Sequence, residues 1–98
     1  MGKITRTKEV DDFLNAILLL ENIEECCVFF EDVCTANEVV SFAQRFQVAR
    51  MLKDKRTYQE IAEASGASTA TISRVKRSID DGGEGYKLIF ERMKNKNL

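Results

Sequence analysis

The chain has 98 residues, of which 44% are hydrophobic and 32% charged, with five glycines and no proline. This length suits a single domain over residues 1–98 with a small core, and the scarcity of helix-breaking residues favours an all-α fold. The sequence has no histidine, no phosphate-binding glycine loop and no nucleophile at a suitable spacing from a base, so it argues against an enzyme.

The formal net charge of −1 conceals two oppositely charged halves. Residues 1–40 carry a net charge of −6, and residues 41–98 carry a net charge of +5. Because a partner responds to the local potential, the basic half predicts a surface that binds an anion. The alternative is a helical surface on which solvated charges of both signs alternate.

The N-terminal segment predicts helices with more apolar surface than a small monomer can bury. Apolar residues between Lys8 and Leu20 recur at steps of three and four, as on one helix face, and a second helix is expected over residues 23–33. The weak break at Glu21 and Asn22 leaves open whether these are one helix or two. The apolar run of residues 13–20 is too short to span a bilayer and does not resemble a signal peptide, so we expect a cytoplasmic protein without membrane association.

Three cysteines occur at positions 26, 27 and 34. An odd number argues against a disulfide scaffold, and two adjacent cysteines without any histidine lack the spacing of metal ligands. We therefore expect Cys26, Cys27 and Cys34 to be small buried apolar residues in a reducing compartment.

A third, longer helix is expected from the sequence TANE, residues 35–38, to about Asp54. Thr35 and Glu38 have the spacing of a capping box, in which a hydroxyl and a carboxylate satisfy free backbone amides at a helix start. The helix has apolar residues on more than one face, which indicates more than one neighbour. We therefore assign residues 1–54 to dimerisation, with core helices shared between two copies.

Residues 57–79 have the pattern of a helix-turn-helix. A second capping box, Thr57 to Glu60, begins a short helix that ends near Ser65, and Gly66 permits the turn. Ser68 can then cap a second helix whose inner side carries apolar residues at steps of three and four. The inner positions are Ile61 and Ala62 in the first helix and Ile72, Val75 and Ile79 in the second. After a glycine-rich connection, a C-terminal helix is expected over residues 84–95.

The opposite side of the second short helix carries small side chains followed by basic ones. Small residues at its N-terminal end allow close approach to base edges in the major groove. The expected outward residues are Ser68, Thr69, Ala70, Ser73 and Arg77, and the expected phosphate contacts are Lys55, Arg56, Lys76 and Arg77. The alternative is a solvated helix face, for which serine and threonine are poor helix formers.

These motifs resemble the Trp repressor family, particularly its Trp-repressor-like bacterial members. The resemblance covers residues 34–79 and rests on TANE and the following QR, on YQEIAEASGAS, and above all on ATISR at residues 70–74. The alignment needs one residue of slack between Phe46 and Arg56. The resemblance implies six helices, an intertwined homodimer and two reading heads on a palindromic operator in double-stranded DNA.

The DNA-contacting positions of the family fall on residues of both short helices. They correspond to Gln59 and Ala62 in the first helix and to Ser68, Thr69, Ala70 and Ser73 in the second. Because Gln59 and Ala62 replace basic residues of the well-known repressor, the resemblance implies a different operator sequence.

The family also binds a small effector between the reading helix and the partner subunit. The resemblance places the ligand carboxylate at Thr35 and Arg45, and the rest of an amino-acid-like co-repressor at Arg74 and Ser78. Val75 replaces a glycine and intrudes on the space of an indole ring, which argues against tryptophan. The alternative role of the two arginines is an ion pair across the dimer or with phosphate.

The sequence therefore predicts a DNA-binding transcriptional regulator, specifically a dimeric repressor. The alternative, from another class, is a helix-turn-helix module that docks onto a protein and has no DNA specificity of its own. In that case the acidic N-terminal half is the active surface.

Overall fold

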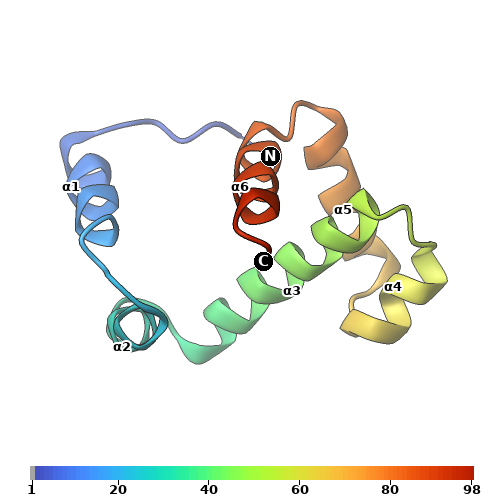
Figure 1. The fold of residues 1–98 in the computed structure, drawn as a ribbon, viewed down its shortest axis with the longest axis horizontal. Helices are drawn as coiled ribbons and strands as arrows, with labels where there is room; N and C mark the ends of the chain where they lie inside the picture. The colour runs from blue at the N-terminus through green and yellow to red at the C-terminus, as the bar shows by residue number, and fades with distance from the viewer. Residues whose placement is uncertain (1) are drawn as a thin grey trace. The chain divides into compact units, whose positions relative to one another are not determined.

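The computed structural model describes residues 2–98, which form six helices and no strand (Figure 1). Each expected helix is present. In chain order the helices are α1 (Lys8–Ile17), α2 (Ile23–Val33), α3 (Ala36–Lys53), α4 (Tyr58–Ser65), α5 (Thr69–Asp80) and α6 (Glu84–Asn95). None of these helices, within residues 2–98, is long and apolar enough to cross a membrane.

The chain divides into two compact units, and the boundary falls inside α3. One unit ends at Val39 and the other is Val40–Leu98. The first unit contains α1 and α2, neither of which has a buried residue. The second unit contains all the buried residues that form the hydrophobic core.

The apolar stretch at the N-terminus forms two helices rather than one. Helix α1 ends at Ile17, so the expected continuation to Leu20 is wrong. The second helix starts afresh because the Asn22 side chain accepts a hydrogen bond of 2.8 Å from the backbone amide of Glu25. Glu25 in turn accepts a bond of 2.9 Å from the Glu21 amide. Such side-chain caps favour a helix start over continuation of the previous helix.

Aromatic side chains join the two N-terminal helices. Phe13 of α1 stacks on Phe29 of α2 with ring centroids 6.1 Å apart, and Phe29 meets Phe30 edge-on at 5.6 Å. The expectation of buried cysteines is wrong here, because Cys26 and Cys27 are exposed and Cys34 is only half-buried. Within the first unit, the packing of α2 that the structure shows is aromatic and does not bury these thiols.

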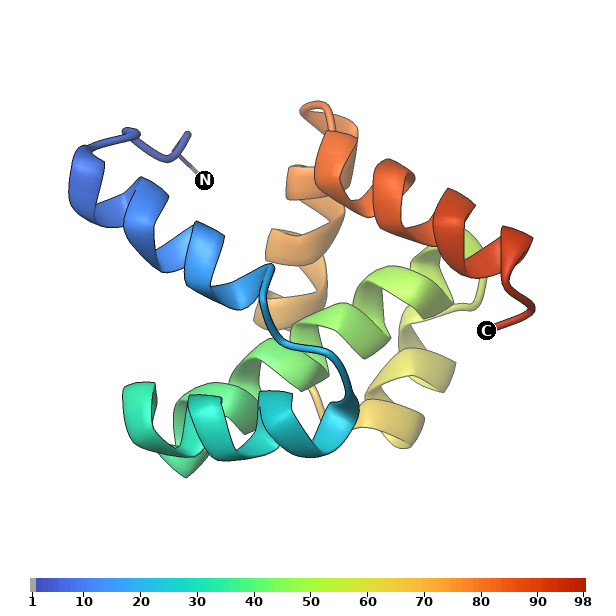
Figure 2. The same cartoon turned by 60° about the vertical axis from the view of Figure 1, so that its left-hand side comes forward.

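The core of the second unit lies where α4 and α5 pack against the C-terminal part of α3, beside α6 (Figures 1 and 2). Helix α3 contributes the fully buried Val48 and Ala49. The interior is completed by Ile61, Ala67, Ile72, Val75 and Phe90. Each fully buried aliphatic side chain contributes about 1.5–3 kcal/mol relative to an exposed one.

A tight turn of three residues connects α5 to α6. Gly82 and Gly83 both have positive φ values, 138° and 59°. A Cβ atom on Gly83 would lie 2.9 Å from both the Cα and the carbonyl oxygen of Ile79. Glycine at position 83 therefore lets the chain leave α5 while touching its last turn.

We expect Gly83→Ala to destabilise the fold by at least about 1–2 kcal/mol, because alanine adds both left-handed strain and overlap with backbone. Urea denaturation at fixed protein concentration measures the change. Gly85→Ala is the matched control: nothing lies within 4 Å of its added Cβ. The control is expected to be neutral or stabilising, since alanine is the better helix former. Equal stability of the two variants would contradict the role of Gly83.

Candidate DNA-binding surface

Helix α4 begins with the capping box that the sequence predicts. The Thr57 hydroxyl accepts a hydrogen bond of 3.1 Å from the Glu60 amide, and the Glu60 carboxylate accepts one of 2.9 Å from the Thr57 amide. Arg56 donates to the same carboxylate at 3.1 Å. The backbone amide of Thr57, followed by its hydroxyl and the Arg56 guanidinium, lowers the pKa of Glu60. The box fixes where α4 starts and how the chain enters it.

The turn between α4 and α5 is set by Gly66, as expected, with a φ value of 72°. Ser65 occupies a position that is usually apolar in this motif. Its hydroxyl donates to the Ile61 carbonyl at 2.6 Å and accepts from the Ala67 amide at 3.1 Å. The serine thus satisfies backbone groups of the turn. The side chain of Gln44 on α3 donates to the Ser65 carbonyl at 3.1 Å and ties the turn to the long helix.

Helix α5 is capped by Ser68 and buries one side. The Ser68 hydroxyl accepts from the Thr71 amide at 3.2 Å. Ile72 and Val75 are 0% and 1% exposed, and they pack with Ile61 of α4 in the core. Because these residues point inward, the positions between them are turned away from the core.

The residues predicted to contact bases differ in exposure, and two of them are half-buried. Gln59 on α4 is exposed and lies within 3.4 Å of the Glu63 carboxylate, whereas Ala62 is half-buried against the core. On α5 the side chain of Ser73 is half-buried. The remaining members of the outward row are exposed: Ser68, Thr69, Ala70 and Arg77. Their contact with DNA stays a prediction.

Two of the four predicted phosphate-contacting residues are held by carboxylates within the chain. Arg56 pairs with Glu60 as described, and Lys76 pairs with Asp80 at 2.7 Å. The hydrogen bond to Asp80, together with its charge, raises the pKa of the Lys76 ammonium. Arg77 is exposed, and no ion pair involves it among residues 2–98.

Lys55, the fourth of these residues, is part of the backbone turn after α3. Its φ value is 60°, in the left-handed region where a side chain is strained. The Lys55 amide donates to Leu52 and the Arg56 amide donates to Met51, which is the hydrogen-bond pattern of a Schellman cap.

The residues predicted to bind an effector make separate contacts within the chain. The Thr35 hydroxyl accepts from the Glu38 amide at 3.1 Å in the first capping box, and the Arg45 guanidinium lies 5.3 Å from the centroid of the Phe42 ring. Arg74 is exposed and Ser78 is half-buried. Val75 points into the core, so its side chain fills space between α3 and α5. A ligand at these residues stays a prediction.

Two features escaped the sequence interpretation. The hydrogen bond from Gln44 to the Ser65 carbonyl joins residues 21 apart in the sequence, and no local sequence pattern predicts it. The other is a pocket of about 380 Å³ on the C-terminal side of α5, which none of the predicted effector residues lines. It requires the packing of three helices from different parts of the chain, which no local sequence pattern predicts.

The fold and the outward row on α5 define a helix-turn-helix protein of the all-α class. The sequence profile of the family described as "Trp repressor protein" matches residues 8–94. The chain therefore belongs to the Trp repressor family, a family of DNA-binding regulators rather than enzymes.

Relatives with similar sequences agree with this assignment. YerC of Bacillus subtilis, a protein of uncharacterised function, is 52% identical over 89 residues, which cover 91% of this chain and 86% of YerC. A TrpR-like protein of Eubacterium eligens has a crystal structure with a TM-score of 0.88 and 54% identity, covering 91% of this chain and 92% of that one. A candidate Trp repressor of Staphylococcus aureus, also solved, has a TM-score of 0.87 and 54% identity, covering 91% and 89%.

The capping boxes make stability depend on pH in a defined direction. The pKa of Glu60 is lower in the folded chain than its ordinary value of 4.5, so its contribution is complete above that value and is lost as the pH falls through the lowered pKa. We expect Glu60→Gln to reduce stability at pH 7 and to flatten the fall in stability from pH 5 toward pH 3. Thermal denaturation across this range measures both effects. The control is Glu91→Gln, which removes an exposed carboxylate in the middle of α6, and a profile as flat as that of Glu60→Gln would refute the role of the box.

Proposed function

We propose that this protein is a transcriptional repressor that binds a palindromic operator as a dimer. The observation that supports this proposal most directly is the two-sided character of α5. One side of the helix is sealed into the core by Ile72 and Val75, and the other presents small polar residues that end in Arg77. This is the arrangement that a recognition helix needs in order to enter a major groove.

The chemistry of the outward row suits close approach to bases. Ser68, Thr69 and Ala70 at the start of α5 have short side chains, so backbone and hydroxyl groups can come near base edges, directly or through water. The N-terminal end of a helix also attracts phosphate through its free amides and its dipole. Arg77, together with Lys55, would meet phosphates and fix the register without reading sequence.

The dimer is supported by the apolar surface of the N-terminal helices. Leu18, Leu19 and Ile23 are 79%, 79% and 82% exposed, and they lie around the α1 to α2 junction. Val28, Val33 and Val40 extend this exposed apolar surface along the chain. A soluble chain rarely leaves so many large apolar side chains in water, so we infer that a second copy covers them.

Control by a small ligand is the finer part of the proposal. Arg45 and Arg74 carry guanidinium groups that suit a carboxylate, and Val75 excludes a large ring from the space that it fills. An amino-acid-like co-repressor other than tryptophan is therefore the effector that these residues favour.

We expect Arg77→Ala to weaken binding to every duplex, and Ser73→Ala to change which sequence is preferred. A palindromic site obtained by selection from random DNA, and a scrambled duplex, are compared by fluorescence anisotropy over a range of salt concentrations. Loss of one phosphate contact per subunit should lower the log–log salt slope of the dimer by about 1.8, since each contact contributes about 0.9.

The control variant is Lys94→Ala, which removes an exposed charge of α6 outside the helix-turn-helix and should leave the slope unchanged. If no duplex binds, or if the affinity does not change with salt concentration, the result contradicts the proposal. If no duplex binds but another protein copurifies with this chain even after nuclease treatment, the result supports the protein-interaction module instead.

The dimer has its own test. Leu19→Glu places a charge in the exposed apolar surface and should shift the molar mass in solution from two chains to one, because a buried charge without a partner is costly. Size-exclusion chromatography with light scattering measures the mass. Asn15→Glu adds the same charge at an exposed polar position of α1 and should leave the dimer intact. A wild-type mass of one chain would contradict the dimer directly.

A further inference from the structure

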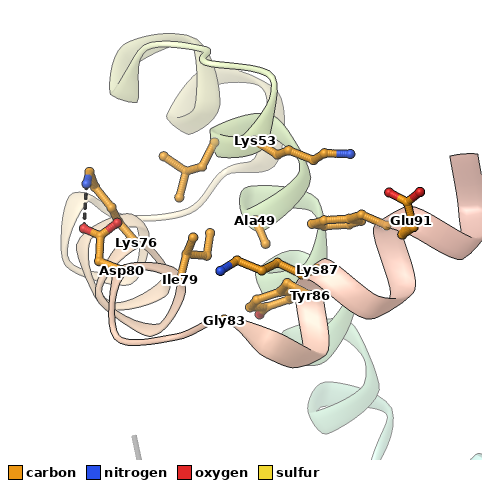
Figure 3. Close-up of a pocket in the computed structure, with 11 residues that line it drawn as sticks. Ala49, Lys53, Lys76, Ile79, Asp80, Gly83, Tyr86, Lys87 and Glu91 are labelled. Atoms are coloured by element: carbon orange, nitrogen blue, oxygen red, sulfur yellow. Dashed lines mark hydrogen bonds and ion pairs between the residues drawn. The ribbon is translucent and has the colours of Figure 1, made fainter.

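Lys76 and Asp80 form an ion pair on α5, one helical turn apart. The Lys76 ammonium nitrogen lies 2.7 Å from a carboxylate oxygen of Asp80, and Figure 3 shows the pair beside the start of α6. Both side chains remain accessible to water, since they are 50% and 59% exposed. Lys76 is one of the residues predicted to contact DNA phosphates. Asp80 therefore neutralises a cation that DNA would otherwise attract.

The stability of α5 does not account for Asp80. This residue is the last of the helix, and an acidic side chain there lies at the negative end of the helix dipole, where it is unfavourable. The order of the pair, with the cation four residues before the carboxylate, is also the less stabilising of the two possible orders. An ion pair between exposed side chains contributes little to folding in any case. The effect of the carboxylate is therefore to be sought outside folding.

The ion pairs of the second unit involve cations at the two ends of the helix-turn-helix. Arg56 pairs with Glu60 at 3.1 Å where α4 begins, and Lys76 pairs with Asp80 where α5 ends. No other lysine or arginine of the second unit forms an ion pair among residues 2–98. Glu60 also belongs to the capping box, which accounts for its presence. Asp80 has no such structural role, so its pairing with a predicted DNA contact is the feature to explain.

A paired cation and a free cation respond differently to DNA. A free ammonium group attracts phosphate over a Debye length of about 10 Å at 0.1 M salt. The charges of Lys76 and Asp80 lie so close together that their effects on a more distant phosphate largely cancel. Lys76 can pair with a phosphate only where that phosphate comes within hydrogen-bonding distance and displaces the carboxylate. Such a close approach requires α5 to be docked in the major groove.

We infer that Asp80 is a specificity-determining residue, which withholds Lys76 from DNA until α5 is docked. On an operator a phosphate replaces Asp80, and the only cost is that of breaking a weak ion pair. On other sequences the protein lies more loosely, Lys76 stays paired, and one phosphate contact per subunit is not made. Asp80 thus lowers sequence-independent binding more than it lowers operator binding. This inference rests on the proposed function, because it presupposes an operator.

The test is Asp80→Asn, which keeps the size of the side chain and removes its charge. Affinities of the full chain for the selected operator and for a scrambled duplex are measured by fluorescence anisotropy over a range of salt concentrations. For the scrambled duplex we expect an affinity about tenfold higher at low salt, from about threefold for each subunit of a dimer. The log–log salt slope for that duplex should steepen by about 1.8, since each of two new phosphate contacts contributes about 0.9. For the operator we expect a gain of about threefold or less, from the removal of two weak ion pairs, and little change of slope.

Two controls isolate the ion pair. Asp81→Asn changes the net charge equally, and Asp81 is an exposed neighbour of Asp80 that forms no ion pair among residues 2–98. This variant should raise both affinities by the same small factor. The other control introduces Asp80→Asn into a Lys76→Gln background. With no ammonium group to release, the effect on the scrambled duplex should be no larger than that of Asp81→Asn.

The outcomes separate this inference from the proposed function. If the wild type prefers the operator but Asp80→Asn strengthens binding to both duplexes equally, or to neither, the inference is wrong and the proposed function stands. A gain of the same size in the Lys76→Gln background would also overturn it, because Asp80 would then act by repelling phosphate directly. Urea denaturation should show Asp80→Asn to be at least as stable as the wild type, and a loss of stability would contradict the inference. If the wild type binds no duplex at any salt concentration, the proposed function and the inference fail together.

Discussion

The burial of Ile72 and Val75 against Ile61 and the long helix is the interaction on which the rest of the structure depends. It contributes about 1.5–3 kcal/mol for each side chain, and it also fixes the rotation of α5 about its own axis. A helix has only one inner side, so sealing these two residues inside decides which residues face the solvent. Gly66 and the bond from Gln44 to Ser65 hold the helix at that setting. The outward row of α5, which we propose to read DNA, is thus a consequence of how the core packs.

The N-terminal helices α1 and α2 contribute no residue to this core. They have well-formed caps and one stacked aromatic contact, but no buried residue within the chain. Isolated helices of 10 and 11 residues are marginal in water, so their stability has to come from packing. If a second copy supplies that packing, folding and assembly become one process, and the stability of the protein depends on its concentration. The exposed cysteines of α2 lie in the same region, which a partner would cover.

Charges of opposite sign are concentrated in different parts of the chain. Residues 1–40, which include the exposed apolar surface of α1 and α2, carry a net charge of −6, and residues 41–98 carry a net charge of +5. Within the second unit, carboxylates hold Arg56 and Lys76, while Arg77 has no such partner among the described residues.

The sequence by itself determined the all-α class, the family, and the helix starts at Thr35, Thr57 and Ser68, because capping boxes and caps involve residues three apart and need no tertiary contact. It also determined the turn at Gly66, since a left-handed residue is a local requirement. Only the tertiary structure decided what has no local signal. It ended α1 at Ile17, left two cysteines exposed, and tied α3 to the turn through Gln44. It also opened the pocket, because a cavity exists only where helices from distant parts of the chain fail to fill the space between them.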